Sequence, residues 1–207
     1  MTSRRRGVVF LDRDGVINVP PSKRYVISWE EFRFLPGVLP ALKQLRRLRF
    51  SAFILSNQAG VGRGWMSRSE LTHLTQNMLK EIRKAGGDIQ AVYYCTHAPD
   101  AGCGCRKPKL GLFRRVRRRW PIDPSRSVVV GDNLTDIQMG QAVGCKTVLV
   151  LTGATNRKML RGSPIRPDRV ARDLPEAVSW ILSVRAEPVE ARTATLRQAQ
   201  GDRKLQS

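Results

Sequence analysis

The sequence predicts an α/β fold in which helices cover both faces of a doubly wound, mainly parallel β-sheet. Short apolar runs, typical of buried strands, alternate along the chain with segments whose apolar residues recur at helical spacing. This alternation is typical of parallel sheets, because each strand needs a crossover, usually a helix, before the next one. The apolar share of 41% in 207 residues is enough for one sizeable core.

Each apolar run ends where turn or polar residues begin, and this sets the expected strand limits. The first run, VVFL, stops at Asp12, and the second, SAFIL, stops at Ser56. The strands are therefore expected at 8–11, 51–55, 89–94, 127–130 and 147–151.

The segments between these strands carry helical signals. Ser67 and Glu70 have the spacing of a capping box, and Gly86 and Gly87 mark the end of the same helix. Helices are expected at 37–50, 67–85, 110–120, 135–143 and 175–184.

The chain reads as one domain with two appendages. We expect a disordered basic arm at 1–6, the α/β domain at 7–184 and a disordered tail at 185–207, which is polar and lacks apolar periodicity. The segments between the motifs leave no room for a large cap domain, so the site should be open.

The formal net charge of +20 points to anionic partners. The densest basic cluster, Arg114–Arg119, lies on an expected helix and lacks the interleaved aromatic residues of a single-strand-binding platform. We therefore interpret the excess as solvated surface and do not expect nucleic acid as the partner. No apolar run approaches the roughly 18–20 residues of a membrane span, and no signal-peptide core precedes Asp12, so we expect a cytoplasmic protein.

Chemically active side chains gather at one edge of the expected sheet. Asp12, Ser56 and Asp132 each follow a different strand, and the loop that carries Lys107 follows another. Ligands of such sheets bind at the carboxyl ends of the strands. Asp14 follows Asp12 after one residue, and two acids beside a core need a cation, hydrogen bonds or substrate to offset their charge.

Three of the four cysteines lie close together and have a histidine among them. Cys95, His97, Cys103 and Cys105 form the pattern C-x-H-x5-C-x-C. Three thiolates and one imidazole suit tetrahedral Zn²⁺ and leave no open position, so we expect a structural zinc loop. The fourth cysteine, Cys145, is expected to be a buried apolar residue.

Four motifs in order give the chain a family resemblance. DRDGVIN, SNQAGVGRG, CTHAPDAGCGCRKPK and VGDNLTD resemble those of the haloacid-dehalogenase-like phosphatases, over roughly residues 7–153. The resemblance implies a Rossmann-like sheet and hydrolysis of a small phosphate ester. Within this family the chain is similar to the branch of heptose bisphosphate and histidinol-phosphate phosphatases.

The resemblance assigns roles that the chemistry of phosphate esters supports. Asp12 would attack phosphorus and form an aspartyl-phosphate, with Mg²⁺ offsetting the repulsion between two anions. Asp14 would give its backbone carbonyl to Mg²⁺ and use its side chain as general acid and then base. Asp132 would complete the carboxylate ligands of the metal, and Asn133 would assist at this site, with Asp136 as the alternative metal contact.

The remaining assigned residues would contact the substrate. Ser56 and Lys107 would hold the transferring phosphoryl oxygens. Arg106 would bind a second anionic group, and Asn57, Gln58 and Tyr25 would line the rest of the pocket.

The resemblance favours the 7-phosphate of a heptose 1,7-bisphosphate as substrate. The Asn57, Gln58 and AGVGRG segment resembles that branch better than the histidinol-phosphate branch, although Arg106-Lys107-Pro108 is similar in both. Two alternatives stay open: histidinol-phosphate hydrolysis, and a basic nucleic-acid 3′-phosphatase or binding protein. We expect a monomer.

Overall fold

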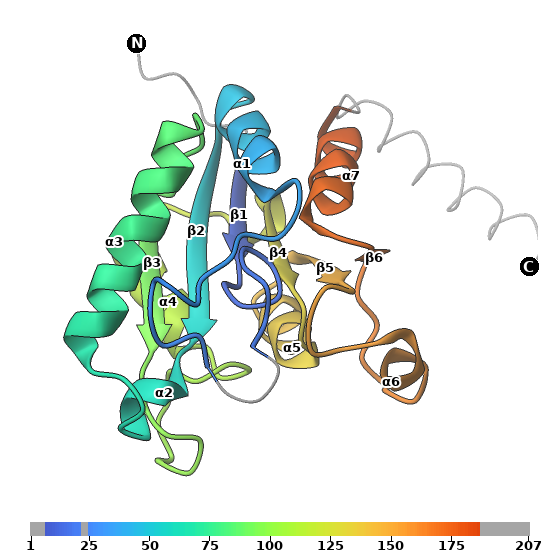
Figure 1. Ribbon diagram of the computed structural model, residues 1–207. Coiled ribbons are helices and arrows are strands. Elements are labelled where there is room, and N and C mark those ends of the chain that lie inside the picture. The colour runs from blue at the N-terminus through green and yellow to red at the C-terminus, as the bar shows by residue number, and fades with distance from the viewer. Residues whose placement is uncertain (1–6, 22–24, 187–207) are drawn as a thin grey trace, which may run out of the picture.

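A computed structural model describes residues 7–21 and 25–186, and these form a six-stranded parallel sheet flanked by helices (Figure 1). The strand order is β3-β2-β1-β4-β5-β6, and every neighbouring pair is parallel. The strands are β1 (Gly7–Leu11), β2 (Phe50–Asn57), β3 (Ala91–Cys95), β4 (Ser127–Gly131), β5 (Lys146–Val150) and β6 (Arg169–Ala171). The predicted doubly wound α/β fold is thus confirmed.

The longer helices lie in two layers, one on each face of the sheet (Figure 1). The layer of α1 (Val38–Arg47), α3 (Arg68–Lys84) and α7 (Leu174–Ala186) packs on one face, and that of α4 (Gly111–Arg117) and α5 (Leu134–Ala142) on the other. Three short elements join the connections: α2 (Ala59–Gly62), η1 (Pro124–Arg126) and α6 (Arg157–Arg161).

The strand pleat divides the core between these two layers. In β1, Val9 and Leu11 pack towards the layer of α1, α3 and α7, whereas Phe10 packs towards α4 and α5. The Phe10 ring lies 5.8 Å from that of Phe53 and 5.4 Å from that of Phe113, centroid to centroid. Burial on both faces explains why the central strands read as continuous apolar runs.

The structure differs from the sequence-based expectation at several element limits. The first helix ends at Arg47, and not at Phe50, because Arg49 adopts a left-handed conformation with φ of 62° that turns the chain into β2. β2 continues through Ser56 and Asn57, which pair with the edge strand β3. Ser56 therefore lies inside the strand and not after it.

Short elements were missed for a physical reason. β6 has three residues and begins with an exposed arginine, and α2 and α6 have four and five residues. Such lengths carry too little periodicity to register in a sequence. α7 continues to Ala186, and the expected arm at 1–6 and the rest of the expected tail lie outside the described residues.

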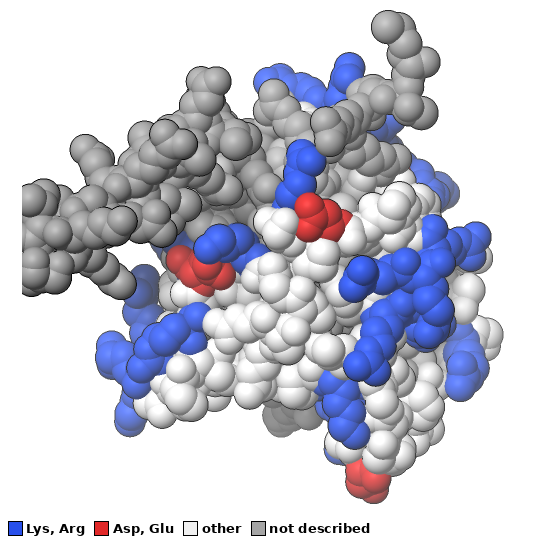
Figure 2. All heavy atoms as spheres, turned by 180° about the vertical axis from the view of Figure 1, so that it is seen from behind, with Lys and Arg blue, Asp and Glu red and all other residues white. Residues whose placement is uncertain are grey.

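Basic side chains gather towards the sides of the face that bears α4 and α5, and mostly uncharged residues lie between them (Figure 2). Five exposed arginines belong to α4 and the residues just after it: Arg114, Arg115, Arg117, Arg118 and Arg119. Among the described helices, none is long and apolar enough to cross a membrane.

Candidate active site

The carboxyl edge of the sheet carries a cavity of about 450 Å³. Most of the residues assigned from the sequence meet there, although they come from four separate stretches of chain. Its lining comprises Asp12, Asp14, Pro20, Pro21, Tyr25, Ser56, Asn57, Arg106, Lys107, Asp132, Asn133, Thr135, Gly153 and Ala154.

Three carboxylates cluster beside this cavity: those of Asp12 and Asp132 line it, and that of Asp136 is buried. One oxygen each from Asp12, Asp132 and Asp136 lies within 4.8 Å of the others. Lys107 joins them: its Nζ lies 3.0 Å from Asp12 Oδ1 and 2.5 Å from Asp136 Oδ1, and it donates to the Leu55 carbonyl at 2.7 Å. One ammonium group thus faces three acids.

The electrostatics of this cluster show an excess of negative charge. Burial and the charges of Asp12 and Asp136 raise the pKa of Asp132 to about 8. Burial, with the charge of Asp12 and against that of Lys107, raises the pKa of Asp136 to about 6. Burial alone would lower the pKa of the Lys107 ammonium, but the two aspartates outweigh it and raise the pKa. A divalent cation that prefers oxygen ligands would relieve this repulsion, so the residues fit Mg²⁺.

Close backbone packing fixes the Asp132 carboxylate. Ala154 donates its backbone N–H to Asp132 Oδ2 at 2.6 Å. Gly15 has a positive φ of 77°, and a Cβ there would lie 2.5 Å from the same oxygen. A Cβ on Gly153 would also collide with Asp132. The Asp-Gly turn after β1 therefore needs glycine for close approach as well as for its backbone conformation.

Asp136 and Asn133 both serve the start of α5. Asn133 Oδ1 accepts from the Thr135 backbone N–H at 3.0 Å, and Asp136 Oδ2 accepts from the Asn133 backbone N–H at 3.2 Å. This reciprocal pair is a capping box. The Asn133 amide lines the cavity but its oxygen is engaged in the cap, and the carboxylate beside Asp12 and Asp132 is that of Asp136.

Asn57 bridges the end of β2 to the backbone of the loop that carries Lys107. Its Oδ1 accepts from the Lys107 backbone N–H at 3.0 Å, and its Nδ2 donates to the Lys107 carbonyl at 3.3 Å. Gln58 is fully buried and is not among the residues that line the cavity. Its amide donates to Asp14 Oδ2 at 2.7 Å and to Ser56 Oγ at 3.1 Å. In this structure both amides support other site residues.

Tyr25 and Arg106 face the same cavity from two loops. The Tyr25 ring lies 5.8 Å from the ring of Trp65, which follows α2. Arg106 has a buried Nη1 that finds no hydrogen-bond partner in the described part of the chain.

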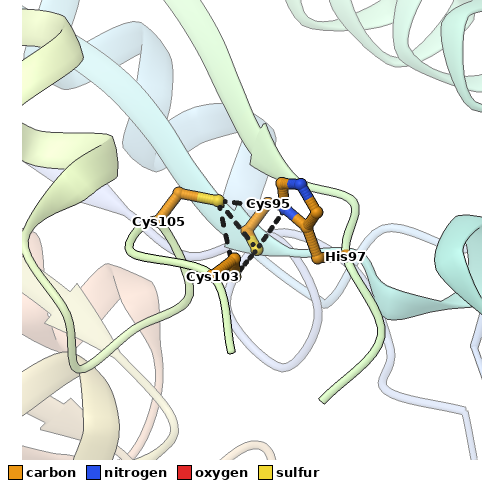
Figure 3. A group of neighbouring side chains, drawn as sticks. All are labelled: Cys95, His97, Cys103 and Cys105. Atoms are coloured by element: carbon orange, nitrogen blue, oxygen red, sulfur yellow. Dashed lines mark hydrogen bonds between the residues drawn. The ribbon is translucent and has the colours of Figure 1, made fainter. Parts of the chain in front are cut away.

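The cysteine-rich loop forms a second, separate cluster (Figure 3). Cys105 Sγ lies 3.2 Å from both Cys95 Sγ and His97 Nδ1, and Cys103 Sγ lies 3.6 Å from Cys95 Sγ. A tetrahedral zinc ion with Zn–S bonds of about 2.3 Å would separate its sulfur ligands by about 3.8 Å. The four groups thus fit Zn²⁺ with little rearrangement. Cys145 lies apart from them, buried in the core beside α5.

The thiols of this cluster differ in acidity. Burial and hydrogen bonding raise the pKa of Cys95 to about 12. For Cys103, burial is outweighed by the backbone N–H groups of Arg106 and Cys105, which lower its pKa to about 7. The loop backbone is therefore arranged to stabilise a thiolate, which is the form that binds zinc.

Sequence reasoning missed Arg13 and Asn18, which are fully buried and donate to the Asp14 carboxylate. The signal was present: a charged residue between two acids at the end of a buried strand needs a partner. Nothing in the sequence showed whether Arg13 would pair with Asp12 or with Asp14.

Comparisons with known proteins agree with this arrangement. Residues 104–177 match the model of the HAD-hydrolase-like family. The D-glycero-beta-D-manno-heptose-1,7-bisphosphate 7-phosphatase of Bordetella bronchiseptica is 34% identical over 84% of this chain and 97% of its own length. The alpha-named counterpart of Campylobacter jejuni is 36% identical over 69% of this chain and 81% of its own.

Solved structures give the same result. The D,D-heptose 1,7-bisphosphate phosphatase of B. bronchiseptica, solved with magnesium and phosphate, superposes with a TM-score of 0.80 at 34% identity and covers 86% of this chain and 98% of its own. The enzyme of Burkholderia thailandensis superposes with a TM-score of 0.66 at 31% identity, over 86% of this chain and 99% of its own. The resemblance stated from the four motifs is confirmed, and the chain belongs to the haloacid-dehalogenase-like family of phosphatases.

Proposed function

We propose that this protein is a Mg²⁺-dependent phosphatase that removes the 7-phosphate of D-glycero-D-manno-heptose 1,7-bisphosphate. One observation carries the proposal: the carboxylate cluster and an unpartnered arginine share one cavity. Lys107 is already engaged by acids and a carbonyl, whereas Arg106 Nη1 finds no partner among the described residues. A substrate with two phosphates would use both features, because guanidinium binds phosphate bidentately.

Asp12 is the nucleophile of the proposed reaction. Its Oδ1 accepts from the Arg13 backbone N–H at 2.7 Å and faces Lys107, which leaves Oδ2 to attack phosphorus. The new bond joins Oδ2 to phosphorus while the bond from phosphorus to the sugar oxygen breaks. Asp14 gives a proton to that sugar oxygen and later takes one from the water that hydrolyses the aspartyl-phosphate. Ser56 donates its hydroxyl to a phosphoryl oxygen, and Lys107 offsets the charge of the phosphoryl group.

The carboxylate oxygens that already accept a hydrogen bond or an ion pair indicate which acids can hold the metal. Both oxygens of Asp136 are used, one by Lys107 and one by the Asn133 backbone N–H. Asp132 accepts on Oδ2 from Ala154, which leaves its Oδ1 for Mg²⁺, and the family resemblance implies Asp12 and the Asp14 backbone carbonyl as further ligands. The predicted Asn133 contact would require its amide to leave the helix cap. When bound, Mg²⁺ supplies charge that offsets repulsion between the nucleophile and the phosphate.

A substrate panel tests the proposal. Phosphate release is measured with Mg²⁺ and with EDTA on heptose 1,7-bisphosphate in both anomeric forms, histidinol phosphate and a 3′-phosphorylated oligonucleotide. The expected result is the highest kcat/KM on a heptose bisphosphate, loss of turnover in EDTA, and a product whose ³¹P spectrum retains the 1-phosphate. A higher kcat/KM on either of the other two esters would overturn the substrate assignment.

We also infer that the protein acts as a cytoplasmic monomer. All assigned groups belong to one chain, and a thiolate zinc site suits a reducing compartment. Light scattering of the purified protein tests the first point, and fractionation of the producing cells tests the second. A stable dimer, or recovery outside the cytoplasm, would refute the respective inference.

A further inference from the structure

Three buried side chains surround the Asp14 carboxylate. Arg13 donates from Nη2 to both Asp14 oxygens at 3.0 Å and from Nε to Oδ1 at 3.2 Å. Asn18 Nδ2 donates to Oδ1 at 2.9 Å, and Gln58 Nε2 donates to Oδ2 at 2.7 Å. A carboxylate offers about four lone-pair sites, so donors on both oxygens leave it one orientation. We name Arg13, Asn18 and Gln58 the Asp14 cradle.

Burying the polar side chains of the cradle is unfavourable for the free energy of folding unless they are paired. All three of its side chains are fully buried, while the Asp14 side chain keeps 18% of its surface exposed at the cavity. A buried guanidinium is unfavourable unless it is paired, and Asp14 is the acid that Arg13 contacts. The Arg13 guanidinium also lies 5.9 Å from the centroid of the Tyr94 ring, which supports it from β3.

Gln58 gives the cradle a link to phosphate binding. The same amide nitrogen that donates to Asp14 also donates to Ser56 Oγ at 3.1 Å. Ser56 lies in β2 and Asp14 follows β1, so one buried amide sets the spacing of a carboxylate and a hydroxyl from two strands. A rigid frame of this kind is what proton transfer at a fixed distance requires.

Resting on the phosphatase function proposed above, we propose that Arg13, Asn18 and Gln58 are positioning residues that hold Asp14 where it can protonate the leaving oxygen. In that step the phosphorus-to-sugar-oxygen bond breaks as Asp12 bonds to phosphorus, and the Asp14 proton passes to the departing oxygen. Arg13 and Asn18 contact neither phosphorus nor metal and act through Asp14, whereas Gln58 also holds the hydroxyl of Ser56.

The test uses the need for a proton on the leaving group. An alkyl ester such as the sugar phosphate leaves as an alkoxide that must be protonated, whereas p-nitrophenyl phosphate leaves as a stable phenolate. The measured quantity is kcat/KM, which reports the steps up to formation of the aspartyl-phosphate and excludes its hydrolysis. For Asn18→Leu and Arg13→Lys we expect kcat/KM on the sugar phosphate to fall about 10- to 100-fold, and less than threefold on the aryl ester.

A double variant separates positioning from a purely structural role. In an Asp14→Asn background, Asn18→Leu should reduce kcat/KM on the sugar phosphate by less than twofold further, because its effect passes through Asp14. Equal losses on both esters, no loss on either, or additive losses in the double variant would overturn the proposal. Arg13→Lys risks misfolding. If its thermal unfolding shows no cooperative transition, Asn18→Leu, whose shape is close to the original, carries the test.

The control is Ser127→Ala, which removes a buried hydroxyl that donates to the Asp123 carbonyl at the opposite end of the sheet. It should lower the melting temperature without changing the ratio of the two kcat/KM values. The two proposals fail in different ways. A wild-type protein that hydrolyses neither ester with Mg²⁺ refutes the proposed function, whereas an active wild type with unselective variants refutes the cradle.

Discussion

At the scale of single residues, some side chains of the site supply its charge and others hold those side chains in place. Asp12, Asp132 and Asp136 concentrate negative charge that one ammonium, Lys107, only partly offsets. Uncharged amides then hold these groups in place: Asn57 fixes the backbone of Lys107, and Gln58 fixes Asp14. Exchanging one of these acids or Lys107 should therefore change the reaction, whereas exchanging an amide, or Arg13 beside Asp14, should change its geometry.

Asp12→Asn should abolish turnover while the protein stays folded. An amide of the same shape cannot attack phosphorus, and loss of a nucleophile costs far more than about 1,000-fold in rate. Phosphate release and thermal unfolding of the same preparation measure the two effects. A folded variant with near wild-type turnover would refute the assignment of Asp12 as the nucleophile.

Arg106→Ala should reduce kcat/KM on a bisphosphorylated sugar about 10- to 100-fold, which corresponds to a charge-assisted hydrogen bond of about 1.5–3 kcal/mol. It should have little effect on the matching monophosphate, which lacks the second anion. Arg117→Ala is the matched control, because it removes one exposed arginine from α4 without touching the cavity. Equal losses on both sugars would argue against a second phosphate site at Arg106.

At the scale of elements, loops carry many of the reactive side chains, whereas the strands are mostly apolar. The zinc loop begins at the end of β3 and delivers Arg106 and Lys107 directly after its last cysteine. Its four candidate ligands lie close enough for one metal ion, although the loop itself has no helix or strand. Metal binding would thus supply order that the backbone alone does not.

Cys103→Ser should lose zinc and most of the activity. The purified wild type is expected to hold about one equivalent of zinc by elemental analysis, and the variant well below that. Cys145→Ala is the control, since it removes a buried cysteine outside the cluster and should retain the metal. Zinc-free wild-type protein with full activity would contradict the structural role of the site.

Ion pairs at the end of the sheet should make stability depend on pH. Arg172 and Arg169 contact the Glu176 carboxylate at 2.8 and 3.3 Å and tie α7 to the segment of β6. Hydrogen bonds from Arg172 lower the pKa of Glu176 to about 2 from its usual 4.5. An acid with a lowered pKa in the folded state stabilises above its unfolded pKa, and this contribution is lost as the pH falls through the folded pKa.

Glu176→Gln should therefore melt below the wild type at pH 6, and the difference should shrink between about pH 4.5 and 2. Paired thermal unfolding curves across this range measure it. A difference that stays constant with pH would show that packing, and not the charge, is responsible.

At the scale of the whole molecule, one sheet separates two cores, and the rings of Phe10, Phe53 and Phe113 form the centre of the smaller one. Phe10→Ala should lower the free energy of unfolding by about 3–5 kcal/mol, a large part of the 5–15 kcal/mol typical of a domain. Urea unfolding measures the loss, and Phe10→Leu should cost much less. A small loss for Phe10→Ala would mean that the second core tolerates a cavity.

The sequence predicted strands and helix starts correctly where the local residue pattern agrees with the tertiary environment. The central strands, buried on both faces, and the capping box at Ser67 and Glu70 are readable because each depends on residues adjacent in the chain. The contact between Asp14 and Gln58 was not readable, because Gln58 follows the neighbouring strand β2 and is distant in the sequence. Pairings across strands depend on register, which residue type alone does not encode.

The two hydrogen bonds from Asn57 to the Lys107 backbone have a consequence for protein engineering. They anchor the backbone of Lys107 to β2, so the residues between the four candidate zinc ligands can vary while Lys107 keeps its place. Loops that retain the four candidate zinc ligands could therefore be exchanged between Cys95 and Cys105 without moving Lys107. Variants with new substrate preferences could then be obtained by grafting this loop alone.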